Sequence, residues 1–486
     1  MERNLTALKP ELVWKHFAQI VRIPRPSGHE EKIRAYVLDF ARSKGLYCLE
    51  DEAHNVYVRK PATPGMEHRK GVVLQAHLDM VPQKNNDKTF DFENDPIDAY
   101  IDGQWVTADG TTLGADNGIG AAAILAVLED DTLVHGPLEA LFTATEETGM
   151  DGAFGLKGGM LQGDILLNLD SETEGELYVG CAGGLDANIR FAYSAEAAPA
   201  GYAAARIAVK GLKGGHSGIQ IIAQRANANK VLFRFLNAAS ARREVLLASV
   251  DGGGLRNAIP REAEAVVLVP QSGYAAFAEE VAAYEATIRA EYAATEDAVS
   301  ITVAPCDAPE AIIARDVAAK LVKAVVACPD GVQRMSTAMP GLVETSTNLA
   351  RVVSDGRSVQ LQCLLRSSVN TAKEALGEAI AAVFALAGAE TELSGSYNGW
   401  NPDMYSPILK AMTESYEALY GVKPAVTAIH AGLECGIIGT SYPGLDMISF
   451  GPTICYPHSP DEKVEIASVA KFYDFLIHTL GNVPAK

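Results

Sequence analysis

Three features that would place a protein in a special class are missing from this sequence of 486 residues. Its seven cysteines are an odd number, scattered, and never spaced as a CxxC pair, which is typical of reduced thiols rather than a disulfide framework. No run of about twenty apolar residues is present, and the first twenty residues lack the apolar core of a secretion signal. We therefore expect a cytoplasmic protein without a membrane partner.

Clustered positive charge is also missing. The formal net charge is -20, and no group of lysines and arginines stands out along the chain. Since binding to nucleic acid requires neutralisation of phosphates, a nucleic-acid partner is not expected. What is present is ordinary for a globular enzyme: 48% apolar residues, 21% charged residues and 43 glycines. The length is too great for one core and predicts about two or three domains.

Strands and helices alternate in the first 180 residues, which predicts an α/β domain. Segments with the apolar spacing of helices and runs of strand length follow one another at 11–23 (helix), 29–45 (helix), 55–61 (strand), 71–80 (strand), 114–130 (helix), 136–150 (strand) and 163–173 (strand).

Three of these apolar strands end in imidazole or acid groups. The first ends in His77 and Asp79, the second in Glu146 and Glu147, and the third in Asp170. Ligands of such sheets bind beyond the carboxyl ends of the strands, so all three should deliver these groups to one edge. Residues two apart on a strand share a side, so the Asp79 carboxylate can meet the His77 ring.

The order of predicted helices and strands changes beyond Gly184. A helix, two strands, a helix and a strand are predicted between about 225 and 306, and the same order returns between 314 and 397. We interpret this as an internally duplicated α+β unit inserted into the first domain. The predicted domains are 1–184 (first domain, first part), 185–399 (inserted domain with both repeats) and 400–486 (first domain, second part).

Candidate metal ligands are two histidines and several carboxylates, a set that Zn²⁺, Mn²⁺ or Co²⁺ accepts. Each has an ordinary interpretation when taken alone: a satisfied core histidine, a helix N-cap at Asp116, a solvated acidic turn at the paired glutamates, a surface histidine at the end. Together, in this order and at these strand ends, they favour a metal site. The candidates are His77, Asp116, Glu146, Glu147, Asp170 and His458.

A family resemblance rests on the same segments. "HLDMVP", "TTLGADNGIG", "TATEETGMDGA", "LLNLDSE" and "PHSPDE" resemble the successive signature segments of the co-catalytic di-zinc peptidase superfamily. "GLKGGHSG", "GLRNAIPRE" and "HAGLECGII" are most similar to its aminoacyl-histidine (Xaa-His, carnosinase-like) dipeptidase branch. The resemblance covers essentially the whole chain and implies a mixed-sheet catalytic domain of this superfamily, with an inserted lid domain.

Residue roles follow from the resemblance. It implies two divalent cations, with Zn²⁺ preferred over Co²⁺ or Mn²⁺. His77 and Asp170 would complete one site, Glu147 and His458 the other, and Asp116 would bridge them. Asp79 would fix the tautomer of His77, and Glu146 would be the general base for a hydroxide held by two zinc ions. The family also carries a cis peptide here, between Asp116 and Asn117.

Substrate contacts are implied further along the chain. His216 is expected to donate a hydrogen bond to the scissile carbonyl oxygen, which becomes negative during the reaction. Asn257 and Arg366 are expected to bind the substrate's carboxylate. Glu434 is expected to bind the substrate's free amine. Two of these residues have a plainer alternative, a flexible loop histidine for His216 and a surface strand residue for Arg366.

The expected reaction is hydrolysis of dipeptides, preferably Xaa-His such as carnosine. An N-acyl amino acid deacylase or tripeptidase of the same superfamily is the alternative. A non-enzymatic binding scaffold is not expected, because such proteins typically lose a metal ligand or the base, and this sequence retains them all. The small peptide is the expected partner, and the chain is expected to be a monomer or a homodimer.

Overall fold

The computed structural model describes residues 3–486, which divide into two compact units. The first holds the residues up to Gly180, together with Pro402–Ala428 and Leu433–Lys486. The second holds Cys181–Asn401 and Ile429–Gly432. The predicted division at 184 and 399 stays a prediction, and it did not include the return of 429–432 to the second unit.

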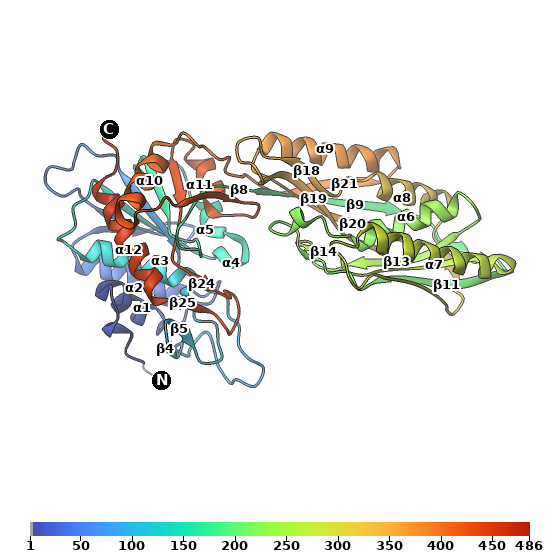
Figure 1. Ribbon diagram of the computed structural model, residues 1–486, viewed down its shortest axis with the longest axis horizontal. Coiled ribbons are helices and arrows are strands. Elements are labelled where there is room, and N and C mark those ends of the chain that lie inside the picture. The colour runs from blue at the N-terminus through green and yellow to red at the C-terminus, as the bar shows by residue number, and fades with distance from the viewer. Residues whose placement is uncertain (1–2) are drawn as a thin grey trace. The chain divides into compact units, whose positions relative to one another are not determined.

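An eight-stranded sheet forms the centre of the first unit (Figure 1). Its four middle strands β6, β3, β7 and β23 run parallel to one another, and strands at both margins are antiparallel. In sheet order the strands are β1 (Tyr47–Glu50), β2 (Val56–Lys60), β6 (Leu138–Thr143), β3 (Val72–His77), β7 (Ile165–Asn168), β23 (Asp446–Ser449), β8 (Glu176–Cys181) and β22 (Ala425–Ile429).

Helices and a small second sheet complete this unit. The helices are α1 (Glu11–Ile20), α2 (Glu31–Ser43), α3 (Ala115–Glu129), α4 (Glu146–Gly149), α5 (Asp151–Gly155), α10 (Pro407–Tyr420), α11 (Glu434–Ser441) and α12 (Ile466–Gly481). The small sheet has the order β24 (Ile454–Cys455), β25 (Lys463–Glu465), β5 (Trp105–Ala108) and β4 (Ala99–Asp102).

The middle strands are buried along almost their whole length because both faces of the sheet are covered. All six residues of β3 are buried, and so are all six of β6. Helix α3 packs on β3 and against α1, and its run of alanines and glycines leaves nearly every residue buried. Since no side of these strands faces solvent, a polar side chain within them needs a buried hydrogen-bond partner.

The second unit is a sheet of antiparallel strands with helices α6 to α9 lying along it (Figure 1). Its strands are, in order, β16 (Ser300–Pro305), β11 (Tyr202–Lys210), β15 (Ala263–Pro270), β13 (Leu246–Gly253), β19 (Val343–Ser354), β20 (Ser358–Ser367), β9 (Gly183–Ala192) and β21 (Glu390–Tyr397), with β18 (Gly331–Met335) also pairing with β19. The helices are α6 (Ala228–Ser240), α7 (Tyr274–Glu291), α8 (Arg315–Ala327) and α9 (Asn370–Leu386). Two short pairs, β10 (Glu196–Ala197) with β17 (Ala311–Ile312) and β12 (Gly215–His216) with β14 (Ala258–Ile259), lie beside it.

The internal repeat is visible in this order. The chain runs α6, β13, β15, α7, β16 in the first half and α8, β19, β20, α9, β21 in the second. The halves meet where β13 pairs with β19, at Asp251 to Gly253, so the strand order outward from that seam is the same on both sides. One apolar cluster, from Leu185 on β9 to Phe384 on α9, joins the helices to one face of the whole sheet.

In the sequence, residues 255–270 and 347–366 look like equivalent hairpins, but this prediction was wrong because residues 255–270 hold β15 without its partner β13. The hairpin equivalent to β19–β20 begins at Leu246 and consists of β13 and β15. The second hairpin turns within 355–357, whereas the first is joined by a longer connection that contains β14. That connection is longer because β14 pairs with β12, which carries His216.

Candidate active site

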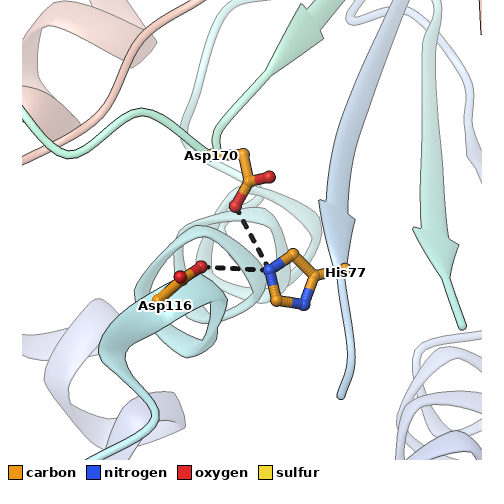
Figure 2. A group of neighbouring side chains, drawn as sticks. All are labelled: His77, Asp116 and Asp170. Atoms are coloured by element: carbon orange, nitrogen blue, oxygen red, sulfur yellow. Dashed lines mark hydrogen bonds and ion pairs between the residues drawn. The ribbon is translucent and has the colours of Figure 1, made fainter. Parts of the chain in front are cut away.

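His77 is the centre of a buried polar cluster at the end of β3 (Figure 2). Its Nε2 lies 3.0 Å from Asp116 Oδ1 and 3.3 Å from Asp170 Oδ1. Asp116 comes from the start of α3, and Asp170 follows β7, the parallel neighbour of β3. The structure thus brings together three ligand candidates that are separated by dozens of residues in the chain.

A second cluster shares Asp116. The other oxygen of this carboxylate, Oδ2, lies 3.2 Å from His458 Nε2, and the same nitrogen lies 2.9 Å from Glu147 Oε2. Glu147 is the second residue of α4, the helix that follows β6, and His458 comes from the loop between β24 and β25. One carboxylate therefore faces both histidines, each with a different oxygen, and the predicted cis peptide at Asp116–Asn117 is present.

Asp79 ties the two segments of the site together. Its Oδ1 lies 3.3 Å from His77 Nδ1 and accepts a hydrogen bond from the Glu146 amide at 2.9 Å. Its Oδ2 accepts from the Glu147 amide at 3.1 Å and from Ser27 Oγ at 2.7 Å. Burial alone would raise the pKa of Asp79, but its hydrogen bond with the charged His77 ring, and then those from Ser27 and the Glu146 amide, hold the pKa at about 2. An ionised Asp79 favours a proton on Nδ1 and leaves Nε2 free to ligate.

Carboxylates dominate the electrostatics of both clusters. Burial alone would lower the pKa of His77, but the carboxylates of Asp170, Asp116 and Asp79 raise it well above its usual value. Hydrogen bonds to Asp116 and Glu147 raise the pKa of His458 to about 11. Burial raises the pKa of Glu146 well above its ordinary range, and neighbouring carboxylates raise it further. Negative charge is in excess here.

The residues present fit divalent cations. Imidazole nitrogens and carboxylate oxygens are a ligand set for Zn²⁺ and for harder cations. Each of the two triads, His77 with Asp116 and Asp170, and Asp116 with Glu147 and His458, offers ligand atoms within 4.8 Å of one another. Glu147 Oε1 is buried and accepts no hydrogen bond from the described residues. Such an orphaned anionic oxygen is costly unless a cation is its partner.

A row of polar side chains that the sequence did not reveal lies one step further inside the sheet. Gln75, Asn168 and Ser449 are aligned on β3, β7 and β23, and each is fully buried. Asn168 Nδ2 donates to Gln75 Oε1 and Ser449 Oγ donates to Asn168 Oδ1, both at 2.5 Å. Each of these residues stands two or more positions before the nearest candidate ligand in the chain. A single polar residue within an apolar strand is therefore its only signal in the sequence.

Glu434 terminates this row. Its Oε2 accepts hydrogen bonds from Gln75 Nε2 at 2.6 Å and Thr143 Oγ1 at 2.8 Å, and its Oε1 is buried without a hydrogen-bond partner among the described residues. Burial raises the pKa of Glu434 to about 7. The carboxylate is 0% exposed in this structure, so its predicted contact with the substrate amine stays a prediction.

The second unit brings His216 and Arg366 together. Gly218 lies between them: a Cβ at this glycine would stand 2.9 Å from His216 Cε1 and 3.1 Å from Arg366 Nε. His216 Nδ1 accepts the amides of Gly218 and Ile219 at 3.2 and 3.1 Å, so the proton of the neutral ring is on Nε2. Burial, then the charge of Arg366, lowers the pKa of His216 and favours that neutral ring.

Arg366 belongs to the sheet face that the helices leave uncovered. It pairs with Ser346 across β19 and β20, and its Nε is buried without a hydrogen-bond partner among residues 3–486. His430, which the sequence did not single out, covers Ser346, with Nε2 2.7 Å from its Oγ. Asn257 is exposed, and its carbonyl accepts the Ser217 amide at 2.8 Å, next to His216.

Comparison with known proteins identifies the family. The sequence pattern described as peptidase family M20/M25/M40 matches residues 73–482. The cytosol non-specific dipeptidase of Escherichia coli strain K12 is 47% identical over 483 residues, which cover 99% of this chain and 100% of that protein. The chain belongs to peptidase family M20/M25/M40 and is a peptide bond hydrolase.

Solved structures agree with this assignment. The crystal structure of aminoacylhistidine dipeptidase from Vibrio alginolyticus is 46% identical, covers 99% of both chains and superposes with a TM-score of 0.95. A tripeptidase from Staphylococcus aureus, with 16% identity, 98% of this chain and 99% of that chain covered and a TM-score of 0.57, shares the fold. Among the described helices, none has the length and apolar character needed to cross a bilayer.

Proposed function

We propose that this chain is a metal-dependent dipeptidase of the cytoplasm that cleaves dipeptides with free termini, Xaa-His dipeptides such as carnosine foremost. One observation carries the proposal: the Asp116 carboxylate faces His77 with one oxygen and His458 with the other, at 3.0 and 3.2 Å. A carboxylate in that position suits two neighbouring cations. Zn²⁺ is the proposed metal at both positions, with Co²⁺ or Mn²⁺ as substitutes.

The names of the two similar full-length proteins support the substrate class. One is named a cytosol non-specific dipeptidase, which also supports the proposed location, and the other an aminoacylhistidine dipeptidase. Both resemble this chain over its whole length. The N-acyl amino acid deacylase alternative has no such relative in its favour, and the tripeptidase similarity extends to the fold alone.

His77, Asp170, Asp116, Glu147 and His458 would hold the cations. When bound, the two cations supply Lewis acidity, which polarises the scissile carbonyl and lowers the pKa of the attacking water. Glu146 stands at the end of β6 beside this cluster and would accept the proton of that water and pass it to the leaving amine. Its amide is fixed by Asp79, so the base and the His77 ring are positioned by one carboxylate.

Groups of the second unit would bind the substrate. The Nε2–H of His216 is a fixed donor suited to the carbonyl oxygen that gains negative charge. The buried, unpartnered Nε–H of Arg366 suits a carboxylate, with Asn257 as a further donor. Glu434 is proposed to recognise the substrate's free amine. The oligomeric state proposed for the active protein is a monomer or a homodimer.

A substrate panel tests the proposal. The protein is stripped with a chelator, reloaded with Zn²⁺, Co²⁺ or Mn²⁺, and assayed with carnosine, other Xaa-His dipeptides, dipeptides ending in other residues, tripeptides and N-acetyl amino acids. We expect chelation to abolish hydrolysis and reloading to restore it. Substrates with a blocked amine should lose about 10- to 100-fold in kcat/KM, the value of one hydrogen bond to a charged group.

Two results would contradict the proposal. Full activity of the chelator-treated protein would show that the reaction needs no metal. A kcat/KM for N-acetyl amino acids or tripeptides above that for every dipeptide would assign the chain to the alternative substrate class.

A further inference from the structure

Four consecutive backbone amides point at one buried carboxylate. The amides of Leu113 and Gly114 donate to Glu462 Oε2 at 2.8 and 2.9 Å, and those of Ala115 and Asp116 donate to Oε1 at 2.7 and 3.2 Å. Glu462 is 2% exposed. Since all four partners are N–H groups, both oxygens of the carboxylate are used as acceptors and the segment that carries Asp116 is held along its whole length.

The same glutamate is attached to the His458 loop. It stands four residues after His458, its own amide donates to the Ser459 carbonyl at 3.0 Å, and its carbonyl accepts Thr107 Oγ1 of β5 at 2.7 Å. His458 is half exposed, and its Nε2 contacts only Asp116 and Glu147 among the candidate ligands. Besides this contact, the Glu462 side chain is a second connection between the segments of Asp116 and His458, which are 342 residues apart in the chain.

Arg25 holds the other side of the Asp116 segment. Its Nη2 donates to the Gly114 carbonyl at 2.5 Å, and its Nη1 donates to the carbonyls of Leu78 and Asp79, both at 2.8 Å. A side chain at residue 114 would collide with this guanidinium, since a Cβ there would stand 2.5 Å from Nη2. The segment is thus connected by a cation to the His77 strand and by an anion to the His458 loop.

We propose that Glu462 is a positioning residue that fixes Asp116 relative to His458 and thereby sets the affinity of the cation site formed by Asp116, Glu147 and His458. The inference rests on the proposed function, because it concerns a cation bound there. Partners that orient metal ligands contribute about 10- to 100-fold to metal affinity. The cation site of His77 and Asp170 does not include His458 and should be affected less.

The test compares Glu462→Gln with Glu139→Gln. A glutamine keeps the size of the side chain but replaces one acceptor with an NH₂ group that repels two of the four amides. Glu139 is a matched control: it is 6% exposed, lies in the same unit, and accepts the Gln162 amide at 3.0 Å, but no ligand candidate is adjacent to it. The change in metal affinity of Glu139→Gln therefore reports the general effect of changing a buried carboxylate in this unit.

The measurement is a titration of the metal-free, full-length protein with Zn²⁺ against a competing chelator. We expect two tight equivalents for the wild type and for Glu139→Gln. Glu462→Gln should keep one equivalent and weaken the other by about 10- to 100-fold. Hydrogen exchange of the amides of residues 113–116 should be faster in this variant before metal is added.

The outcomes separate the inference from the proposed function. Wild-type affinity at both sites in Glu462→Gln, or an equal weakening in both variants, would overturn the inference alone. A wild type that binds fewer than two cations would overturn the proposed function, and the inference with it. If Glu462→Gln does not fold, Glu462→Asp takes its place, since it keeps the charge but reaches about 1.5 Å less far; unchanged binding there overturns the inference too.

Discussion

The two units carry their polar groups in different places. In the first unit, reactive side chains follow the ends of parallel strands whose faces are both covered, as at His77, Glu147 and Asp170. In the second, the buried polar residues Arg366 and Ser346 are paired across adjacent strands of an antiparallel sheet. The difference shows two ways to fix a polar group, by the geometry of a strand end or by neighbours on adjacent strands.

Under the proposed function, this contrast predicts that the first unit supplies the metal ligands and the base and that the second unit supplies most of the substrate contacts. The strongest test concerns the base. Glu146→Gln should lower kcat about 10²- to 10⁴-fold, the usual value of general base catalysis, with little change in KM and with both cations retained. Steady-state kinetics on carnosine and metal analysis of the same sample measure this.

Glu52→Gln serves as its control, because Glu52 is an exposed carboxylate paired with Lys157. A Glu146→Gln variant that keeps wild-type kcat would end the assignment of the base. Loss of bound cation in this variant would place Glu146 among the ligands instead.

A smaller effect is expected in the second unit. Arg366→Lys replaces a planar fork with a point charge and removes the buried Nε–H, so KM should rise about 10- to 100-fold, with kcat less affected. Arg206→Lys is the matched control, since Arg206 is an exposed strand arginine of the same unit, paired with Glu264. A fall in kcat at unchanged KM would show that the division between the units is wrong.

The smallest effect concerns the stability of the first unit away from its site. Burial lowers the pKa of His16 from 6.5 to about 4, although its Nε2 lies 2.8 Å from Glu129. A histidine with a lowered pKa contributes stability above pH 6.5 that is lost as the pH falls towards 4, because the unfolded chain takes up the proton first. The wild type should lose about 2 kcal/mol between pH 7 and pH 5 from this group.

Urea unfolding at the two pH values measures that loss. His16→Gln should lack this component, whereas a change at the exposed His68 should keep it. Equal pH dependence in the wild type and His16→Gln would mean that His16 is protonated in the folded protein.

The sequence predicted most of the first unit because its signals are local. Most candidate ligands there lie at the end of an apolar strand, shortly after it or at the start of a helix, so the order of strands and helices favours a meeting of His77, Asp116 and Asp170. His458, in the loop between β24 and β25, has no such local signal. The partners of these groups were missed for a physical reason. Arg25 and Glu462 act on backbone groups of distant segments, and such contacts leave no pattern in composition or spacing.

The second unit was predicted as a repeat but not in its register. The order of helices and strands was correct because apolar periodicity reports it. Three features depend on contacts between segments far apart in the chain. They are the seam between β13 and β19, the long connection containing β14, and the contact of His430 with Ser346. Nothing near His430 in the sequence indicates which strand it covers.

The repeat within the second unit has an evolutionary consequence. When two identical chains form such a sheet, every substitution is made twice, and any gain in one half is imposed on the other. Joined in one polypeptide, the halves mutate separately, which permits the long connection at 254–262 on one side and the short turn at 355–357 on the other. An insertion that serves His216 can therefore be kept without a matching one elsewhere.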